Sequence, residues 1–233
     1  MPHRRLVLFD IDGTLLLTMG AGRRAITAAM AEVIGTDAVF EGVRFDGKTD
    51  PQIVSELLQA AGDPDPADAA RISAVCDRYA DLLETELQRP TARVDVMPGV
   101  FALLDRLEQD SRAVLGLLTG NLARGAALKL RKGGIDPERF AVGAYGSDSA
   151  HRPALPPIAA SRAERVLGRV PHGHEVVIIG DTPADVACGA SLGARAVAVA
   201  TGGYTLEQLS ACGPYAAFSN LSDTDAVVAA ILD

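Results

Sequence analysis

The regular alternation of strand and helix patterns over residues 113–232 constrains the fold more than any other feature of this chain. Apolar runs at residues 113–118 and 175–180 have the length and composition of buried strands, and segments with helical spacing follow them. Alternation of this kind is typical of a parallel sheet with helices on both faces. The sequence therefore predicts an α/β protein built on a doubly wound, Rossmann-like parallel sheet.

The elements of this sheet can be assigned from the same patterns. The predicted strands are residues 4–9, 113–118, 141–145, 175–180, 195–200 and 216–218. The predicted helices between and after them are residues 100–107, 121–132, 155–167, 183–192, 206–211 and 224–232.

Residues 20–88 break this pattern, because they contain helical stretches and no convincing strand. The stretches are residues 23–34, 51–60 and 67–87. An all-helical insertion therefore interrupts the α/β domain after its first strand. We expect a core of residues 1–17 and 90–233 and a helical cap domain of residues 18–89.

The first strand ends in two carboxylates, Asp10 and Asp12, which Gly13 and Thr14 follow. Ligands of α/β sheets bind at the carboxyl ends of strands. Two carboxylates at such a place could hold a hard cation such as Mg²⁺, or act as a nucleophile and a proton carrier. The alternative is a strand that runs into a polar turn, where the carboxylates only cap the next segment.

Three further polar clusters follow predicted strands. They are Thr119-Gly120-Asn121, His151-Arg152, and the segment from Asp181 to Asp185. In a parallel sheet the carboxyl ends of all strands lie at one edge. These groups are therefore expected to converge with Asp10 and Asp12 on one crevice.

Together these segments resemble the haloacid dehalogenase-like (HAD) superfamily, whose members are mostly phosphatases. Asp10-Ile11-Asp12-Gly13-Thr14 is similar to its first motif, Thr119 to its second, and the segment 180–185 to its fourth. The helical insertion also lies where this family places its cap, between motifs one and two. Within the family the chain looks most like the phosphoglycolate-phosphatase-type branch.

The resemblance implies roles for the acidic residues. Asp10 would be the nucleophile that forms an aspartyl-phosphate, and Asp12 would protonate the leaving oxygen and then deprotonate water. Asp10, the main-chain carbonyl of Asp12, and Asp181 would hold Mg²⁺, with Asp185 supporting that shell directly or through water.

The resemblance also implies how the phosphoryl group is bound. Thr119 and the amide of Gly120 would contact its oxygens, and Asn121 is grouped with them as a substrate-binding residue. Because the dehalogenase and phosphonatase branches lack a carboxylate at the position of Asp12, this residue favours a phosphatase or a phosphomutase.

Motif three departs from the family pattern, because the expected lysine is missing. The expected place, after the strand that ends near Tyr145, holds Arg152. We predict that Arg152 is the replacement cation, because arginine can neutralise both a phosphoryl group and Asp10. The alternative is that Arg152 is an ordinary loop residue and that Lys129 or Lys132 reaches the site. Both lysines lie on the helix after motif two and are expected to face solvent.

Lys48 is the one lysine of the predicted cap. It lies in the loop Gly47-Lys48-Thr49-Asp50, and caps in this family deliver residues that contact substrate. The alternative is an exposed lysine at a helix start, where Asp50 and Pro51 form an N-cap and N1 pair.

Charge and cysteine content limit the partners. The net charge of −8 and the pI of about 5.0 argue against a nucleic-acid-binding protein. The three cysteines are widely spaced and form no metal or redox motif, which is typical of a reducing compartment. Residues 1–5 lead into a strand and not into a leader, and no apolar run is long enough to span a membrane, so we expect a cytoplasmic protein.

These observations predict a Mg²⁺-dependent hydrolase that acts on a small phosphate monoester through an aspartyl-phosphate. A phosphomutase of the β-phosphoglucomutase type is the enzymatic alternative. A phospho-aspartate signalling or binding module is the alternative without catalysis, and the helical insertion and the missing lysine argue against it.

Overall fold

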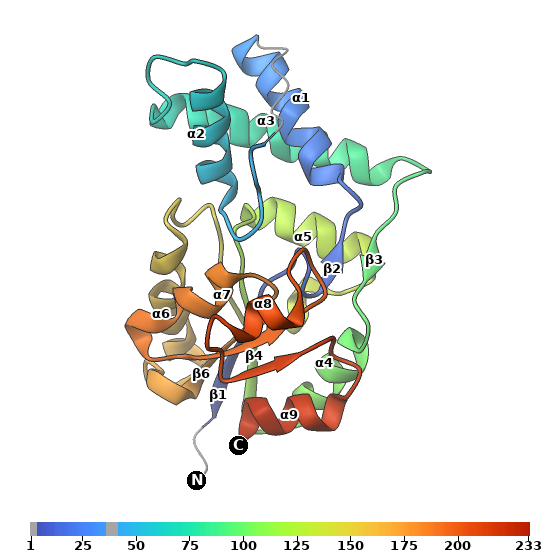
Figure 1. The fold of residues 1–233 in the computed structure, drawn as a ribbon, viewed down its shortest axis with the longest axis vertical. Helices are drawn as coiled ribbons and strands as arrows, with labels where there is room; N and C mark the ends of the chain where they lie inside the picture. The colour runs from blue at the N-terminus through green and yellow to red at the C-terminus, as the bar shows by residue number, and fades with distance from the viewer. Residues whose placement is uncertain (1–3, 36–41) are drawn as a thin grey trace.

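A six-stranded sheet forms the centre of the molecule in the computed structural model, which describes residues 4–35 and 42–233 (Figure 1). The strand order is β5-β4-β1-β6-β7-β8, and each neighbouring pair is parallel. This confirms the predicted doubly wound sheet. The strands are β1 (Arg5–Phe9), β4 (Ala113–Leu118), β5 (Val142–Ala144), β6 (Val176–Gly180), β7 (Arg195–Val199) and β8 (Ala216–Phe218).

Helices cover both faces of this sheet. One face packs against α4 (Val100–Glu108) and α9 (Thr224–Leu232), and the other against α6 (Leu155–Leu167) and α7 (Pro183–Cys188). The remaining core helices are α5 (Ala123–Lys132) and α8 (Leu206–Ser210). Short 3₁₀ helices span Pro137–Arg139, Arg152–Ala154, Gly173–Glu175 and Ala190–Leu192.

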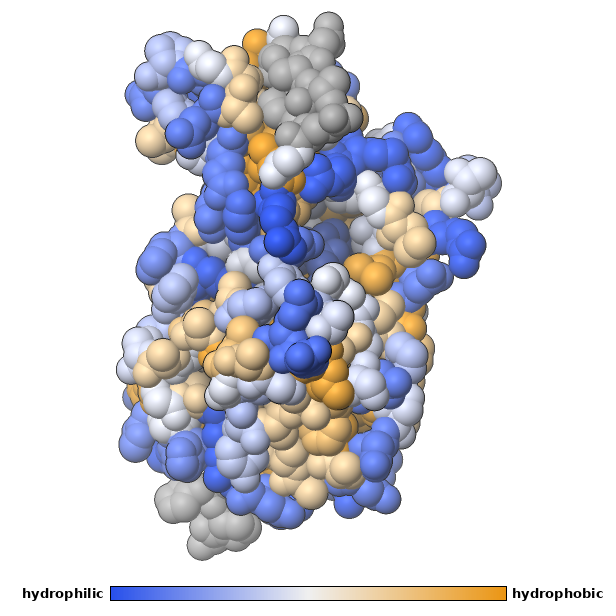
Figure 2. Space-filling model, viewed as in Figure 1, coloured by the Kyte–Doolittle hydropathy of each residue, from blue (hydrophilic) through white to orange (hydrophobic). Residues whose placement is uncertain are grey.

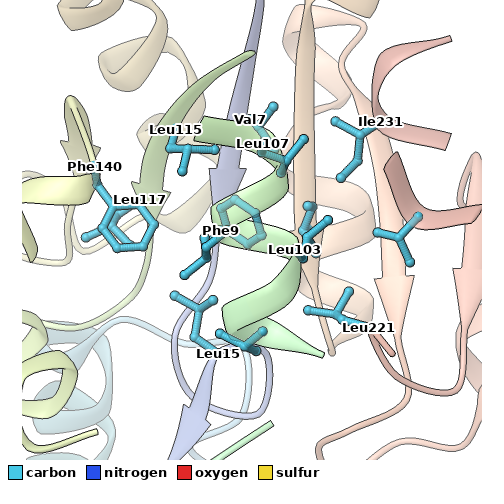
Figure 3. Packing of buried hydrophobic residues seen from close by; sticks show 14 of the residues in the cluster. Val7, Phe9, Leu15, Leu103, Leu107, Leu115, Leu117, Phe140, Leu221 and Ile231 are labelled. Carbon is cyan, nitrogen blue, oxygen red and sulfur yellow. The ribbon is translucent and has the colours of Figure 1, made fainter. Parts of the chain in front are cut away.

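The central strand β1 explains why its sequence is continuously apolar. Val7 and Phe9 point into one hydrophobic cluster, whereas Leu6 and Leu8 point into the cluster on the opposite face. Figure 3 shows Val7 and Phe9 among side chains of α4 and β4. A strand buried on both faces carries no polar alternation, and it holds the residues at its carboxyl end rigidly.

Three helices stand apart from the sheet: α1 (Ala21–Ile34), α2 (Asp50–Ala60) and α3 (Ala69–Gln88) (Figure 1). They form a hydrophobic cluster of their own around Tyr79 and Leu83. We call α1–α3 and the loop 42–49 the cap. The exact boundaries at residues 18 and 89 stay a prediction.

Two features differ from the predicted elements. β2 (Leu16–Leu17) and β3 (Asp95–Val96) form a small antiparallel pair that the sequence did not indicate, where the chain enters and leaves the cap. The predicted helix 183–192 is divided, because α7 ends at Cys188 and a 3₁₀ helix follows Gly189. A Cβ on Gly189 would lie 2.6 Å from the Ile178 side chain, so the chain passes close to the sheet there.

Two predictions concerned the location of the protein: the absence of a leader and the absence of a membrane-spanning segment. Residues 1–3, on which the expected absence of a leader partly rests, lie outside the described residues. Among residues 4–35 and 42–233, none of the helices combines the length and apolar character that crossing a membrane requires.

Candidate active site

The polar strand ends converge on a pocket of about 370 Å³ between the carboxyl edge of the sheet and the cap. In the space-filling view the surface is hollowed between these two parts (Figure 2). A volume of this size suits a small ligand. The predicted site residues that line it are Asp10, Asp12, Lys48, Thr119, Gly120, Asn121, Arg152 and Asp181. Asp185 lies behind this wall and reaches it through Arg152.

The loop after β1 brings Asp10 and Asp12 to the pocket. The Asp10 amide continues the sheet by donating to the Ile179 carbonyl at 2.9 Å. Gly13 then turns the chain with φ +85°, and a Cβ there would lie 2.3 Å from Asp181 Oδ2. Only glycine combines this conformation with such a close approach, which explains the glycine of motif one.

Asp10, Asp181 and Asp185 form a buried carboxylate cluster, in which one oxygen of each lies within 4.8 Å of the others. Burial, and then the charges of Asp185 and Asp10, raise the pKa of Asp181 well above its usual value. Burial also raises the pKa of Asp10, although Arg152 acts in the opposite direction. It is therefore unfavourable for all three carboxyl groups to be ionised together unless a further cation is bound.

This cluster fits a hard divalent cation, because it offers carboxylate oxygens and excess negative charge. Thr14 Oγ1 donates to Asp181 Oδ1 at 3.1 Å and so orients that carboxylate. Both oxygens of Asp185 already accept bonds, Oδ1 from Arg152 and Oδ2 from the Thr182 hydroxyl and amide. The oxygens that remain able to bind a metal ion therefore belong to Asp10 and Asp181. Asp185 is better placed to support these two residues.

Arg152 reaches the cluster from the 3₁₀ helix before α6. Its Nη2 lies 3.2 Å from Asp10 Oδ2 and also pairs with Asp185. Burial alone would lower the pKa of Arg152, but the charges of Asp185 and Asp10 outweigh it and raise the pKa. The predicted replacement for the motif-three lysine therefore contacts the predicted nucleophile.

The prediction that Lys129 faces solvent is wrong. Lys129 is 4% exposed, and its Nζ donates to both carboxylate oxygens of Asp12, at 2.8 and 2.6 Å, and to Asn121 Oδ1 at 2.6 Å. Lys132 is exposed, as predicted. The missed signal was helical spacing: Gly125, Ala126, Lys129 and Leu130 share the buried face of α5.

The motif-two residues Thr119 and Asn121 form one network with Asp12. Asn121 Nδ2 donates to Thr119 Oγ1 and to Asp12 Oδ2, both at 2.8 Å. Among the described residues, none accepts a hydrogen bond from the Thr119 hydroxyl, so its proton is available to a ligand. The Asn121 side chain thereby links motif two to Asp12.

The cap loop closes directly onto motif two. A Cβ on Gly120 would lie 1.9 Å from the Lys48 carbonyl oxygen, and the Asp50 amide donates to the Gly120 carbonyl at 2.8 Å. Glycine is therefore required at position 120 for this contact. The Lys48 side chain lines the pocket but pairs with Glu56 of α2, and its predicted contact with substrate stays a prediction.

The prediction that Asp50 is the N-cap of α2 is also wrong. Thr49 is the N-cap, and its hydroxyl accepts a bond from the Gln52 amide at 3.2 Å. The buried Asp50 carboxylate instead accepts from the Leu122 amide at 2.8 Å and so joins the cap to the start of α5. Burial raises the pKa of Asp50 to about 6, against the effect of Lys129.

A parallel sheet with a helical insertion and a carboxylate cluster at its strand ends defines a class of α/β hydrolase. The chain belongs to the family of haloacid dehalogenase-like hydrolases, whose sequence model matches residues 4–193. It is 30% identical over 222 residues to a phosphoglycolate phosphatase of Rhodospirillum rubrum, covering 94% of this chain and 88% of that protein. These matches confirm the predicted family and enzyme class, a HAD-like hydrolase of the phosphatase type.

Solved structures agree with the fold. A hydrolase from Pseudomonas syringae superimposes with a TM-score of 0.74 at 19% identity, covering 99% of this chain and all 100% of the other. CbbY from Rhodobacter sphaeroides, solved in complex with phosphate, gives a TM-score of 0.71 at 20% identity, covering 94% of this chain and 96% of the other. At these identities the likeness concerns the fold.

Proposed function

We propose that this protein is a Mg²⁺-dependent phosphatase that hydrolyses a small phosphate monoester through an aspartyl-phosphate on Asp10. The observation that carries the proposal is the convergence of Asp10, Asp12, Thr119 and Arg152 on one pocket. These groups offer a nucleophile, a proton carrier, a hydroxyl donor and a cation, which are the parts that phosphoryl transfer needs.

The first step transfers the phosphoryl group to the enzyme. An Asp10 carboxylate oxygen attacks phosphorus, the bond from phosphorus to the ester oxygen breaks, and Asp12 gives a proton to that oxygen. Arg152, 3.2 Å from Asp10, neutralises charge on the nucleophile and on the equatorial oxygens. The Thr119 hydroxyl and the Gly120 amide hold the phosphoryl group in line.

The second step releases phosphate. Water attacks the phosphorus of the aspartyl-phosphate, Asp12 takes the proton from that water, and the bond between phosphorus and Asp10 breaks. Asp10 is thereby restored as a carboxylate. Asp12 suits both steps because it lines the pocket beside Asp10, and its side chain is 39% exposed toward the cavity and solvent.

Asp10, Asp181 and the main-chain carbonyl of Asp12 would hold Mg²⁺, and when bound the ion supplies positive charge to the transferring phosphoryl group. The pocket volume of about 370 Å³ under the cap favours a small substrate. Phosphoglycolate, named in the curated relative, is the first substrate to test.

The test is phosphate release from phosphoglycolate, sugar phosphates and an aryl phosphate, with Mg²⁺ and with EDTA. We expect metal-dependent release from at least one of them. Interconversion of sugar phosphates without phosphate release would support the mutase instead. A folded, metal-loaded protein that does neither would contradict the proposal.

Asp10→Asn should lower turnover by at least about 10⁴-fold, because an amide cannot act as the nucleophile. The measurement is kcat on the best substrate, together with acid-quench trapping of a phosphoenzyme in the wild type. Asp46→Asn is the matched control, since Asp46 also lines the pocket but pairs with Arg44 at 3.2 Å and lies outside the carboxylate cluster. Comparable losses in the two variants would contradict the role of Asp10.

A further inference from the structure

The ammonium group of Lys129 is directed at Asp12 and Asn121. A lysine ammonium carries three N–H donors. The Nζ atom of Lys129 lies 2.8 and 2.6 Å from Asp12 Oδ1 and Oδ2, and 2.6 Å from Asn121 Oδ1. Lys129 therefore lines the pocket with its ammonium group bonded to Asp12 and Asn121.

The same bonds fix the Asp12 carboxyl group in one orientation. Lys129 holds both of its oxygens, and Asn121 Nδ2 donates to Oδ2 at 2.8 Å. Asn121 is itself oriented, because its oxygen accepts from Lys129 and its nitrogen donates to Thr119 Oγ1 at 2.8 Å. Without Lys129, the half-exposed Asp12 side chain would keep only the bond from Asn121.

Residues of the cap lie next to Lys129. A Cβ on Gly22 of α1 would lie 3.7 Å from Lys129 Nζ and 3.6 Å from the Tyr79 hydroxyl. Asp50 of α2 lies close enough for its charge to interact with that of Lys129. Lys129 is thus enclosed between α5 and the cap, which leaves its ammonium group directed at Asp12.

We propose that Lys129 is a positioning residue that aims the Asp12 carboxyl group at the leaving oxygen and then at the attacking water. This inference rests on the proposed function, and it assigns to Lys129 a task separate from that of Arg152. Arg152 pairs with the nucleophile Asp10, whereas Lys129 donates hydrogen bonds to the proton carrier Asp12 and to the side chain of Asn121.

The leaving group provides the test, because only a poor leaving group needs a well-placed proton. Lys129→Met should lower kcat/KM for an alkyl phosphate by about 10²- to 10³-fold, which lies in the lower part of the usual range of a general-acid contribution. For 2,4-dinitrophenyl phosphate the loss should be under about fivefold, because dinitrophenolate leaves unprotonated. Water attack still needs Asp12, so this substrate should show a burst of dinitrophenolate followed by slow turnover.

Lys132→Met is the matched control, since Lys132 lies one turn further along α5 and is exposed. It should change neither substrate's kcat/KM by more than about twofold, as expected for a surface residue outside the site. Retained dinitrophenyl phosphate hydrolysis also shows that Lys129→Met is folded.

Chemical rescue separates positioning from packing. Lys129→Cys, alkylated with 2-bromoethylamine, regains an ammonium group on a side chain of nearly lysine length. It should recover most of the activity toward the alkyl phosphate. A Cys212→Ser background removes the exposed native thiol from this experiment.

Equal losses for both leaving groups, or a rise in KM with unchanged kcat, would overturn the inference and make Lys129 a substrate-binding residue. Failure of the rescue with retained folding would overturn it as well. A wild type that hydrolyses neither substrate would instead overturn the proposed function, and this inference with it.

Discussion

The pocket contains two cation–carboxylate centres that are built differently. The Arg152 centre consists of Arg152, Asp10, Asp181 and Asp185, all buried in the core. The Lys129 centre consists of Lys129, Asp12 and Asn121, and it lies where α5 meets the cap. The first has three carboxylates for one cation, whereas the second has one carboxylate and a neutral amide for one ammonium group.

This difference indicates what each centre needs from outside. In the Arg152 centre, burial and mutual repulsion raise the pKa of Asp10 and of Asp181, so a divalent cation would relieve the excess charge. In the Lys129 centre the single carboxylate of Asp12 is paired with Lys129, and Gly22 and Asp50 of the cap lie next to it. The two centres should therefore respond to different perturbations.

Replacing Arg152 should produce the larger effect, because it leaves the buried carboxylates without their cation. Arg152→Met should lower kcat/KM by about 10³-fold or more and destabilise the protein by about 3–5 kcal/mol. Arg152→Lys restores the cation that is usual for motif three and should keep more activity. The measurements are kcat/KM and urea unfolding.

Arg152→Met with activity within tenfold of the wild type would contradict the assignment. So would equal activities of Arg152→Met and Arg152→Lys, because the charge would then be irrelevant. Selective loss with poor leaving groups would mean that Arg152 acts through Asp12, and the distinction between the centres would fail.

The contact between the cap and the Lys129 centre should be sensitive to pH through Asp50. Its pKa in the folded protein is raised from 3.8 to about 6, so the folded state binds this proton more tightly than the unfolded state. The resulting stabilisation is present below about pH 4 and is lost as the pH rises through about 6. Groups that interact with Asp50 are Lys129, Asp12, Cys76 and Tyr79.

Asp50→Asn removes this titration while keeping an oxygen that can accept the Leu122 amide bond. The stability of the wild type relative to Asp50→Asn should fall by about 2 kcal/mol between about pH 4 and pH 7. Urea unfolding of both proteins across this range measures the difference, in which titrations common to both cancel. A difference that does not change with pH would contradict the burial of a charged Asp50.

The sequence predicted the Arg152 centre far better than the Lys129 centre, for a physical reason. Asp10, Asp181 and Arg152 follow strands, and parallel strands bring their carboxyl ends to one edge whatever the details of packing. Lys129 lies in a helix, where only the spacing of its small and apolar neighbours shows that it is buried.

Asp50 and the strands β2 and β3 could not be predicted in the same way. The local sequence of Asp50 fits a helix cap, and only the docking of α2 on the loop before α5 makes its carboxylate a partner of Leu122. Strands of two residues carry too little periodicity to be recognised, and β2 and β3 exist because the two cap connections run side by side.

The smallest expected effect concerns the metal and distinguishes the centres without any substrate. If the Arg152 centre needs a divalent cation, Mg²⁺ at ten times its Kd should stabilise the wild type by about 1.4 kcal/mol, or a few degrees in Tm. Asp181→Asn removes a ligand and one excess buried charge, so it should lose this stabilisation without lowering the Tm measured in EDTA.

Lys129→Met should keep the Mg²⁺-induced shift in Tm, because the Lys129 centre contributes no carboxylate to the cluster. A shift that survives in Asp181→Asn but disappears in Lys129→Met would place the cation beside Asp12 and reverse the comparison.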